Sequence, residues 1–217
     1  MKKVLALMMA VMLLCCGLAG CGAASNNSSD VPQKTDMQYI KDKGELIVGI
    51  TDFAPMDYQD ADGKWIGFDA EMAELFAKRL GVKAKFQIVD WNNKAMELDG
   101  KTVDVIWNGM TLTDEVKAAM DCSNAYCNNA QIVVVKADKA DQYKTVDSVK
   151  GLKFAVENGS AGEEQVTALG AEFVEVDDQA LALAEVKAGT VEAAAIDSLM
   201  AAAMVGEGTG FADLMYT

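Results

Sequence analysis

Histidine is absent from this chain of 217 residues, and arginine occurs once, at Arg79. Without histidine the protein lacks the side chain that most often serves as general base or metal ligand. No nucleophile motif or metal-ligand cluster stands out either, so an enzyme is disfavoured and no cofactor is expected. Basic residues are also few, because 19 lysines and arginines face 33 acidic residues, for a net charge of −14. This charge argues against nucleic acid and anionic lipid headgroups as partners.

The sequence has only a short apolar run near its start. Residues 4–14 are wholly apolar and follow two lysines, but a bilayer span needs about 20 residues, so this pattern indicates a signal peptide. The segment ends in Leu18-Ala19-Gly20-Cys21, which resembles the bacterial lipobox. We therefore predict a lipoprotein signal peptide over 1–21, and the alternative is a secretory signal with a chance cysteine. The resemblance implies that a lipid on Cys21 anchors the protein to the membrane, outside the cytoplasm.

The residues after Cys21 are predicted to form a flexible tether over 22–40. The first part, GAASNNSSDVP at 22–32, is small and polar with no apolar periodicity, so it cannot bury enough surface to order itself. Without the signal, 17 basic and 33 acidic residues remain, for a net charge of −16. The rest of the chain, about 175 residues, is long enough for one large domain or two small lobes.

Two cysteines remain in the predicted folded part, Cys122 and Cys127, in the segment CSNAYC. A disulfide that closes so short a loop is geometrically possible and would stabilise the fold modestly. Two free thiols are the alternative, and both stay open. A zinc site is disfavoured by this spacing and by the lack of histidine.

Strand-like and helix-like segments alternate along the folded part. Strands are expected at 46–50, 86–89, 103–106, 131–136, 154–156, 172–176 and 193–196. Helices are expected from Asp69, as N-cap, to Gly81, from Ser160, from Asp178 to Gly189, and from Asp197. Large apolar residues fall at helical spacing on the first helix: Phe68, Met72, Leu75, Phe76 and Leu80.

These two βαβ-type sets predict an α/β fold with two parallel-sheet lobes. Lobe one is placed at 41–132, and the crossover with lobe two at 133–217, with QIVVVK (131–136) as the natural crossover. Ligands bind beyond the carboxyl ends of parallel strands. The candidate binding segments are therefore TDFAPM (51–56), WNGMT (107–111), ENGSAG (157–162) and Asp197.

The order of five segments resembles the extracellular solute-binding proteins of amino-acid ABC importers. These segments are TDFAPM (51–56), GKWIGFDAEMAELFAKRLG (63–81), VDVIWNGMTLT (103–113), GLKFAVENGSAGE (151–163) and ALAEVKAGTVEAAAID (182–197). The resemblance implies the type II periplasmic-binding-protein fold, in which two lobes joined by crossover strands close on an amino acid and present it to a membrane permease. It also implies a monomer. The alternatives are an enzyme on the same fold, such as a dehydratase using Asp52 or Glu97, and a sensor that is not coupled to transport.

The resemblance assigns ligand roles to the first lobe. Gly109 and Thr111 match positions that hold the ligand ammonium or carboxylate, and Asn108 belongs to the same loop. Phe53 matches an aromatic residue that packs on the ligand, although a core position is an equal alternative. Asp52 matches a polar group near the ligand side chain.

In the second lobe, Asp197 matches the family's ammonium-binding aspartate, although it could also cap the helix that follows it. Ser160 and Glu163 form a capping-box pattern, which could be purely structural. The pattern leaves the amide of Ala161 available at a helix N-terminus, where anions bind favourably.

Two features depart from the family pattern. Three residues after Thr113, where members usually carry an arginine that clamps the ligand carboxylate, this chain has Val116. The adjacent Lys117 could substitute as a point charge, or the ligand is not an ordinary α-amino acid. Glu157 and Asp57 add negative charge near the expected cleft, which favours a cationic or strongly polar ligand. Members also continue past this point, so a C-terminal return to lobe one is expected to be missing here, leaving apolar surface on that lobe.

Overall fold

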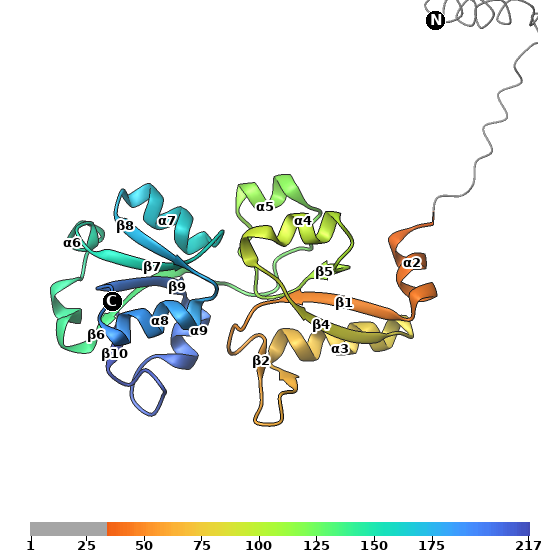
Figure 1. Cartoon of the computed structure of the whole chain (residues 1–217), viewed down its shortest axis with the longest axis horizontal. Helices are drawn as coiled ribbons and strands as arrows, with labels where there is room; N and C mark the ends of the chain where they lie inside the picture. The colour runs from red at the N-terminus through yellow and green to blue at the C-terminus, as the bar shows by residue number, and fades with distance from the viewer. Residues whose placement is uncertain (1–33) are drawn as a thin grey trace, which may run out of the picture. The chain divides into compact units, whose positions relative to one another are not determined.

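The computed structural model describes residues 34–217, so the predicted signal peptide, Cys21 and the tether up to residue 33 lie outside the described residues (Figure 1). Helix α2, Asp36–Lys43, begins where Thr35 accepts a hydrogen bond from the Gln38 amide, and it ends at Gly44 with φ 79°. A side-chain N-cap and a left-handed glycine are the ordinary boundaries of a helix. The tether predicted over 22–40 therefore extends too far, because its last five residues are helical.

The first lobe is built on a three-stranded parallel sheet in the order β4-β1-β5. Its strands are β1 (Glu45–Ile50), β4 (Lys83–Ile88) and β5 (Val105–Ile106), and a small hairpin adds β2 (Tyr58–Gln59) and β3 (Trp65–Ile66). Its helices are α3 (Phe68–Leu80), η1 (Trp91–Asn93), α4 (Lys94–Asp99) and α5 (Asp114–Ala119). The core gathers around β1, whose Leu46, Val48 and Ile50 are buried.

Helix α3 confirms the predicted helix but not its cap. The N-cap is Gly67, not Asp69, and Asp69 lies buried in the first turn. The helix buries its small residues, Ala70, Ala73 and Ala77. The large apolar residues instead keep 41–56% of their surface exposed: Phe68, Met72, Leu75 and Phe76. These four side chains form an exposed apolar surface along α3.

The second lobe is built on a five-stranded sheet in the order β10-β6-β9-β7-β8. Its strands are β6 (Gln131–Lys136), β7 (Lys153–Glu157), β8 (Glu172–Val176), β9 (Ala193–Asp197) and β10 (Leu214–Tyr216). Strands β7, β8 and β9 run parallel, but β6 is antiparallel to both β9 and β10. The sheet is thus mixed rather than wholly parallel.

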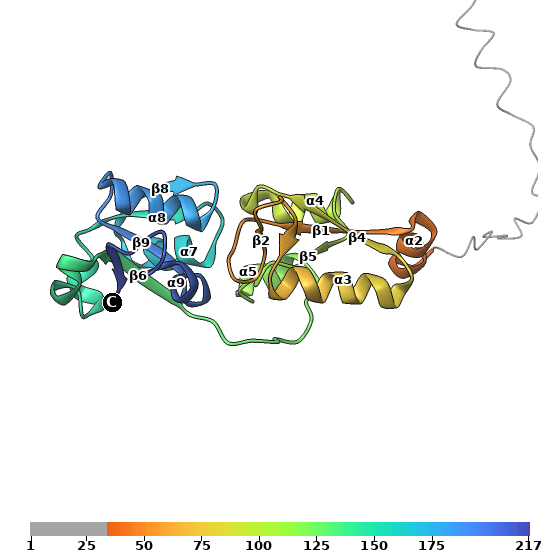
Figure 2. The same cartoon turned by 90° about the horizontal axis from the view of Figure 1, so that it is seen from below.

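The segment that crosses between the lobes is not β6. Strand β6 pairs along its length with β9, so the predicted boundary at 132/133 falls inside a strand of the second lobe. The crossing is made by the connection that leaves α5 and enters β6 (Figure 2). Contacts group residues 35–217 into one compact unit.

Helices cover both faces of the second sheet. They are η2 (Ala137–Gln142), α6 (Val146–Val149), α7 (Ala161–Leu169), α8 (Gln179–Ala188) and α9 (Ser198–Met204). Ala155 packs in one core cluster with Leu183 of α8, whereas its neighbours Phe154 and Val156 pack in another with Val166 of α7. Burial on both faces explains why β9 reads as a continuous apolar run. No helix within residues 34–217 is long and apolar enough to cross a membrane.

Two carboxyl groups, those of Asp57 and Asp69, lie buried close together in the first lobe. Asp69 accepts hydrogen bonds from the Gly109 amide (2.6 Å) and the Tyr126 hydroxyl (2.8 Å). Neither carboxyl oxygen of Asp57 has a hydrogen-bond partner among the described residues. Burial, together with the charge of Asp69, raises the pKa of Asp57 to about 8. Asp57 is therefore protonated at neutral pH in the folded protein.

This raised pKa predicts a pH-dependent stability. Between the ordinary aspartate pKa and pH 8, the unfolded chain has lost the proton that folded Asp57 keeps, so the free energy of unfolding should fall as pH rises, by at most about 1.4 kcal/mol per pH unit. Asp57→Asn, which mimics the protonated acid, should flatten this decline and raise the melting temperature at pH 8.5. Thermal unfolding from pH 5 to 9 measures both effects.

The matched control is Asp62→Asn, which makes the same substitution at an exposed site in the nearby hairpin. It should leave the slope unchanged. Equal slopes for the wild type and Asp57→Asn would show that Asp57 is ionised in the folded protein.

Candidate functional site

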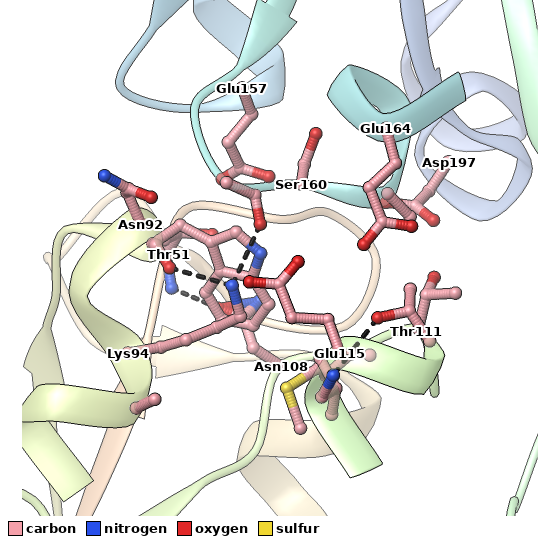
Figure 3. A pocket seen from close by; sticks show the side chains of 18 of the residues that line it. Thr51, Asn92, Lys94, Asn108, Thr111, Glu115, Glu157, Ser160, Glu164 and Asp197 are labelled. Carbon is pink, nitrogen blue, oxygen red and sulfur yellow. Dashed lines mark hydrogen bonds between the residues drawn. The ribbon is translucent and has the colours of Figure 1, made fainter. Parts of the chain in front are cut away.

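A pocket lies between the two lobes, where strands of both sheets end (Figure 3). This is where ligands bind in open α/β sheets. Seven of the predicted binding residues line it: Phe53, Asn108, Gly109, Thr111, Ser160, Ala161 and Asp197. Thr51, Trp91, Lys94, Glu115, Val116, Glu157, Glu164 and Gln179 also line it.

Asp197 is held at the end of β9 by amide groups from three segments. Its Oδ1 accepts from Gln131 (2.7 Å) and from Asn129, and its Oδ2 accepts from Gln179. Gln179 also accepts a hydrogen bond from the Asp197 backbone amide (2.9 Å). Burial raises the pKa of Asp197, while these side-chain amides lower it by stabilising the charged form. The residue occupies the N-cap position of α9, but its side chain makes no capping bond.

Gly109 and Phe53 fit together at the wall of the pocket. Gly109 has φ 59°, and a Cβ atom on it would lie 2.5 Å from the Phe53 ring, so a side chain is excluded. Phe53 is 3% exposed and packs with Met56 and with Met200 of the second lobe. Phe53 therefore lines the pocket and also belongs to an apolar cluster that joins the lobes.

Asn108 presents a buried donor beside the pocket. Its Oδ1 accepts a hydrogen bond from the Thr51 amide, which fixes the direction of the side chain. Its Nδ2 is buried and has no partner among the described residues. An unpaired buried donor costs about 1–3 kcal/mol, so this position favours a ligand with a hydrogen-bond acceptor. Thr111 also lines this wall, and its hydroxyl lowers the pKa of Asp197 by hydrogen bonding.

Ser160 caps helix α7, as the pattern predicts, by accepting a hydrogen bond from the Glu163 amide (3.2 Å). The second bond of a capping box, from the Ser160 amide to the Glu163 side chain, is not formed. The Glu163 side chain accepts from the Gly159 amide instead (2.6 Å). The amide of Ala161 is in the first turn, where helical amides have no intrahelical acceptor. The positive end of a nine-residue helix therefore faces the pocket.

Asp52 and Lys117 lie outside this pocket. Asp52 borders a separate hollow with Asp178 and stays exposed at its surface. Partial loss of solvent in this hollow, together with the charge of Asp178, raises the pKa of Asp52. Lys117 is exposed and pairs with Asp114 at 3.5 Å, whereas Val116 is 6% exposed and lines the pocket.

The cysteines and the acidic residues form no metal or disulfide site in the described part of the chain. Cys122 and Cys127 are exposed free thiols, which is the second of the two alternatives. No group of three or more potential ligands within residues 34–217 could hold a metal ion.

The residue-by-residue prediction missed Trp91, Lys94 and Gln179. Lys94 donates to the carbonyl oxygens of Trp91 (3.1 Å) and of Gly159 (2.9 Å), so it links α4 to the second lobe. The backbone at Gly159 lies too close to Asn92 for a side chain, because a Cβ atom on it would lie 2.6 Å from Asn92 Cα. Trp91 and Gln179 each come three residues after a strand, at β4 and β8. The strand-end rule, applied to those two strands as well, would have found both.

Comparison with known proteins gives matches along most of the chain. Residues 46–203 match the family of bacterial extracellular solute-binding proteins, family 3. The L-cystine-binding protein TcyA of Bacillus subtilis (strain 168) is 35% identical over 202 residues, which cover 91% of this chain and 74% of TcyA. The L-cystine-binding protein TcyJ of Escherichia coli (strain K12) is 32% identical over 169 residues, and the match spans 76% of this chain and 64% of TcyJ.

Solved structures show the same relationship. The arginine-bound form of truncated ArgBP (residues 20–233) from T. maritima has a TM-score of 0.77 and 34% identity, covering 82% of this chain and 84% of that one. The ancestral amino acid-binding protein AncCDT-1, a precursor of cyclohexadienyl dehydratase, has a TM-score of 0.74 and 32% identity, covering 78% and 77%. The fold is thus that of the type II periplasmic binding proteins, and the chain belongs to family 3 of the bacterial extracellular solute-binding proteins.

Proposed function

We propose that this protein is the substrate-binding component of an ABC importer, and that it captures a polar amino acid between its lobes and delivers it to a membrane permease. The proposal rests on one observation. The same pocket contains a carboxylate supported by three amides, at Asp197, and a buried amide donor without a partner, at Asn108. The ammonium and carboxylate of an amino acid complement these two groups. One chain supplies both walls of the pocket, so we propose that it acts as a monomer.

In this proposal the ligand carboxylate is bound without a guanidinium group. Val116 lines the pocket where the family pattern has arginine, and Lys117 lies outside. The available donors are Nδ2 of Asn108 and the first-turn amides of α7. A helix N-terminus stabilises an anion through its free amides and its dipole. Phe53 and Trp91 provide apolar walls for the rest of the ligand.

An enzyme on this fold is the less favoured function. Asp52 and Glu97, the carboxylates that a dehydratase on this fold would use as acid or base, do not line the pocket. Acid–base catalysis needs a group within hydrogen-bond reach of the reacting atom. The relatives TcyA and TcyJ are binding proteins by name, which supports binding without turnover.

Asp197→Asn tests the ammonium site. The substitution keeps the shape of the side chain but removes the charge that meets the ligand ammonium. Hydrogen bonds to charged groups contribute about 1.5–3 kcal/mol, so affinity should fall roughly ten- to a hundredfold. A thermal-shift panel of amino acids identifies a ligand, and calorimetry then compares the two proteins. Asp177→Asn is the control outside the pocket, and unchanged affinity in Asp197→Asn would contradict the assignment.

Val116→Arg tests how the carboxylate is bound. An arginine that reaches the pocket should bind an amino acid more tightly, by up to about tenfold, through a bidentate contact. The corresponding amine, which is the same ligand without its carboxylate, should bind to Val116→Arg no more tightly than to the wild type. Calorimetry with both compounds, and circular dichroism to confirm folding, measures this. Weaker binding of the amino acid to a folded variant would mean that no ligand carboxylate lies near residue 116.

Cys21 is proposed as the lipid anchor, because it alone follows the Leu-Ala-Gly pattern. Cys21→Ala should release the protein into the medium or leave it unprocessed. Cys15→Ala and Cys16→Ala should be processed and anchored like the wild type. Labelling of cells with a radioactive fatty acid, followed by fractionation, separates these results. A lipid-labelled product from Cys21→Ala would exclude this site.

A further inference from the structure

Glu157 is a buried carboxyl group that the binding of an amino acid's ammonium and carboxylate does not use. It ends strand β7, lines the pocket and is 3% exposed. Its Oε2 accepts a hydrogen bond from Gln179 (3.2 Å), the residue that also holds Asp197. Its Oε1 is buried and accepts no hydrogen bond within the described part of the chain. The pocket therefore contains an unsatisfied acceptor in addition to the ammonium site.

The charges around Glu157 favour a cation. Glu115 of α5 and Glu164 of α7 are exposed and line the same pocket, and Figure 3 shows their carboxyl groups extending from opposite lobes into the space below Glu157. Lys94 is the one basic side chain among the described residues that line the pocket. Its ammonium group already donates to two backbone carbonyls, at Trp91 and Gly159. Carboxyl groups therefore outnumber the available positive charge, and a cleft of one sign attracts ligands of the other.

We propose that Glu157 binds a second cationic group of the ligand, so that the natural ligand is an amino acid with a guanidinium or ammonium group on its side chain. This inference rests on the proposed function, because it places the α-ammonium of the same ligand at Asp197. Glu157 then determines specificity inside the pocket, and Glu115 and Glu164 attract the cation at its rim. A neutral ligand of the same shape would leave Oε1 without a charged partner.

The ionisation of Glu157 gives the proposal a distinct signature. Burial, with smaller contributions from the charges of Asp197 and Asp178, raises the pKa of Glu157 to about 8, while hydrogen bonding from the side chains of Gln179 and Thr51 lowers it. Lys94 faces it from α4. Without ligand, Glu157 therefore holds its proton at pH 7. A bound cation lowers the pKa of a neighbouring carboxyl group, so binding should release up to about one proton and strengthen as pH rises from 6 to 8.5.

Two pairs of ligands with closely matched shapes test the proposal: L-arginine with L-citrulline, and L-ornithine with L-norleucine. Calorimetry on the purified full chain at pH 7, in two buffers of different ionisation enthalpy, measures affinity and proton release together. In at least one pair the cationic ligand should bind about ten- to a hundredfold more tightly, as a charged hydrogen bond predicts. Only the cationic ligand should release the extra proton.

Two variants separate this specificity role from a structural one. Glu157→Gln should reduce the preference for the cation to less than about threefold and abolish the extra proton release. Glu175→Gln, which removes the same charge from the exposed neighbour on β8 that pairs with Val156, should keep both. Circular dichroism confirms that each variant is folded.

The outcomes also separate this inference from the proposed function. If the neutral member of each pair binds as tightly as the cationic one, the role of Glu157 is overturned while amino-acid binding stands. An undiminished preference in folded Glu157→Gln also overturns it. If none of the four compounds binds, and a panel of amino acids produces no thermal shift, the proposed function fails and this inference fails with it.

Discussion

The buried carboxylate of Asp197 is the constraint on which the pocket depends. A buried charge is costly unless hydrogen bonds compensate it, and here the donors come from three separate segments. Gln131 lies directly opposite Asp197 in the β6–β9 pairing, Gln179 begins α8, and Asn129 belongs to the connection between the lobes. The Asp197 carboxylate receives all of these hydrogen bonds only when the three segments are correctly placed around it. The requirement to compensate this one charge therefore positions the part of the pocket that the second lobe supplies.

A second buried carboxylate has the corresponding role in the first lobe. Asp69 accepts from the Gly109 amide, which shapes the loop at the pocket, and from Tyr126 in the connection. The Tyr126 ring also stacks on Phe68 with centroids 6.2 Å apart. The connection is thus fixed to the first lobe at Tyr126 and to the second at Asn129, three residues later. Lys94, which donates to Gly159, and Phe53, which packs on Met200, also hold the two lobes together, so a change in the angle between them would have to break these contacts as well.

Local signals in the sequence were sufficient for most of the secondary structure but not for the packing of α3. Apolar strands, and glycines at positions 81 and 189 with φ 79°, marked the elements and their ends correctly. Asp69 looked like an N-cap because capping is a local rule, whereas its real partners come from residues 40 and 57 positions away. The buried face of α3 was also not obvious, because alanines, not the large apolar residues, allow the helix to lie against β1.

The residues that line the pocket were predictable where they follow a strand end, and not where the direction of a side chain brings them there. Asp197, Asn108 and Gly109 followed from the position of their strands. Lys94 could not be found in this way, because it reaches the second lobe from within a helix, through a contact 65 residues away in sequence. Long-range contacts of this kind leave no local pattern.

Helix α5 shows how one position along a helix determines the charge of the pocket. Thr113 accepts a hydrogen bond from the Val116 amide (3.2 Å), which fixes where the helix starts. Glu115 and Val116 both line the pocket. Successive residues on a helix point about 100° apart, so Lys117 lies about 200° around the helix from Glu115, and it pairs with Asp114 instead. Lys117 therefore does not line the pocket. With valine at position 116 and Glu115 at the rim, α5 adds a carboxyl group and no positive charge to the pocket, and Lys94 is the one basic side chain among the described residues that line it.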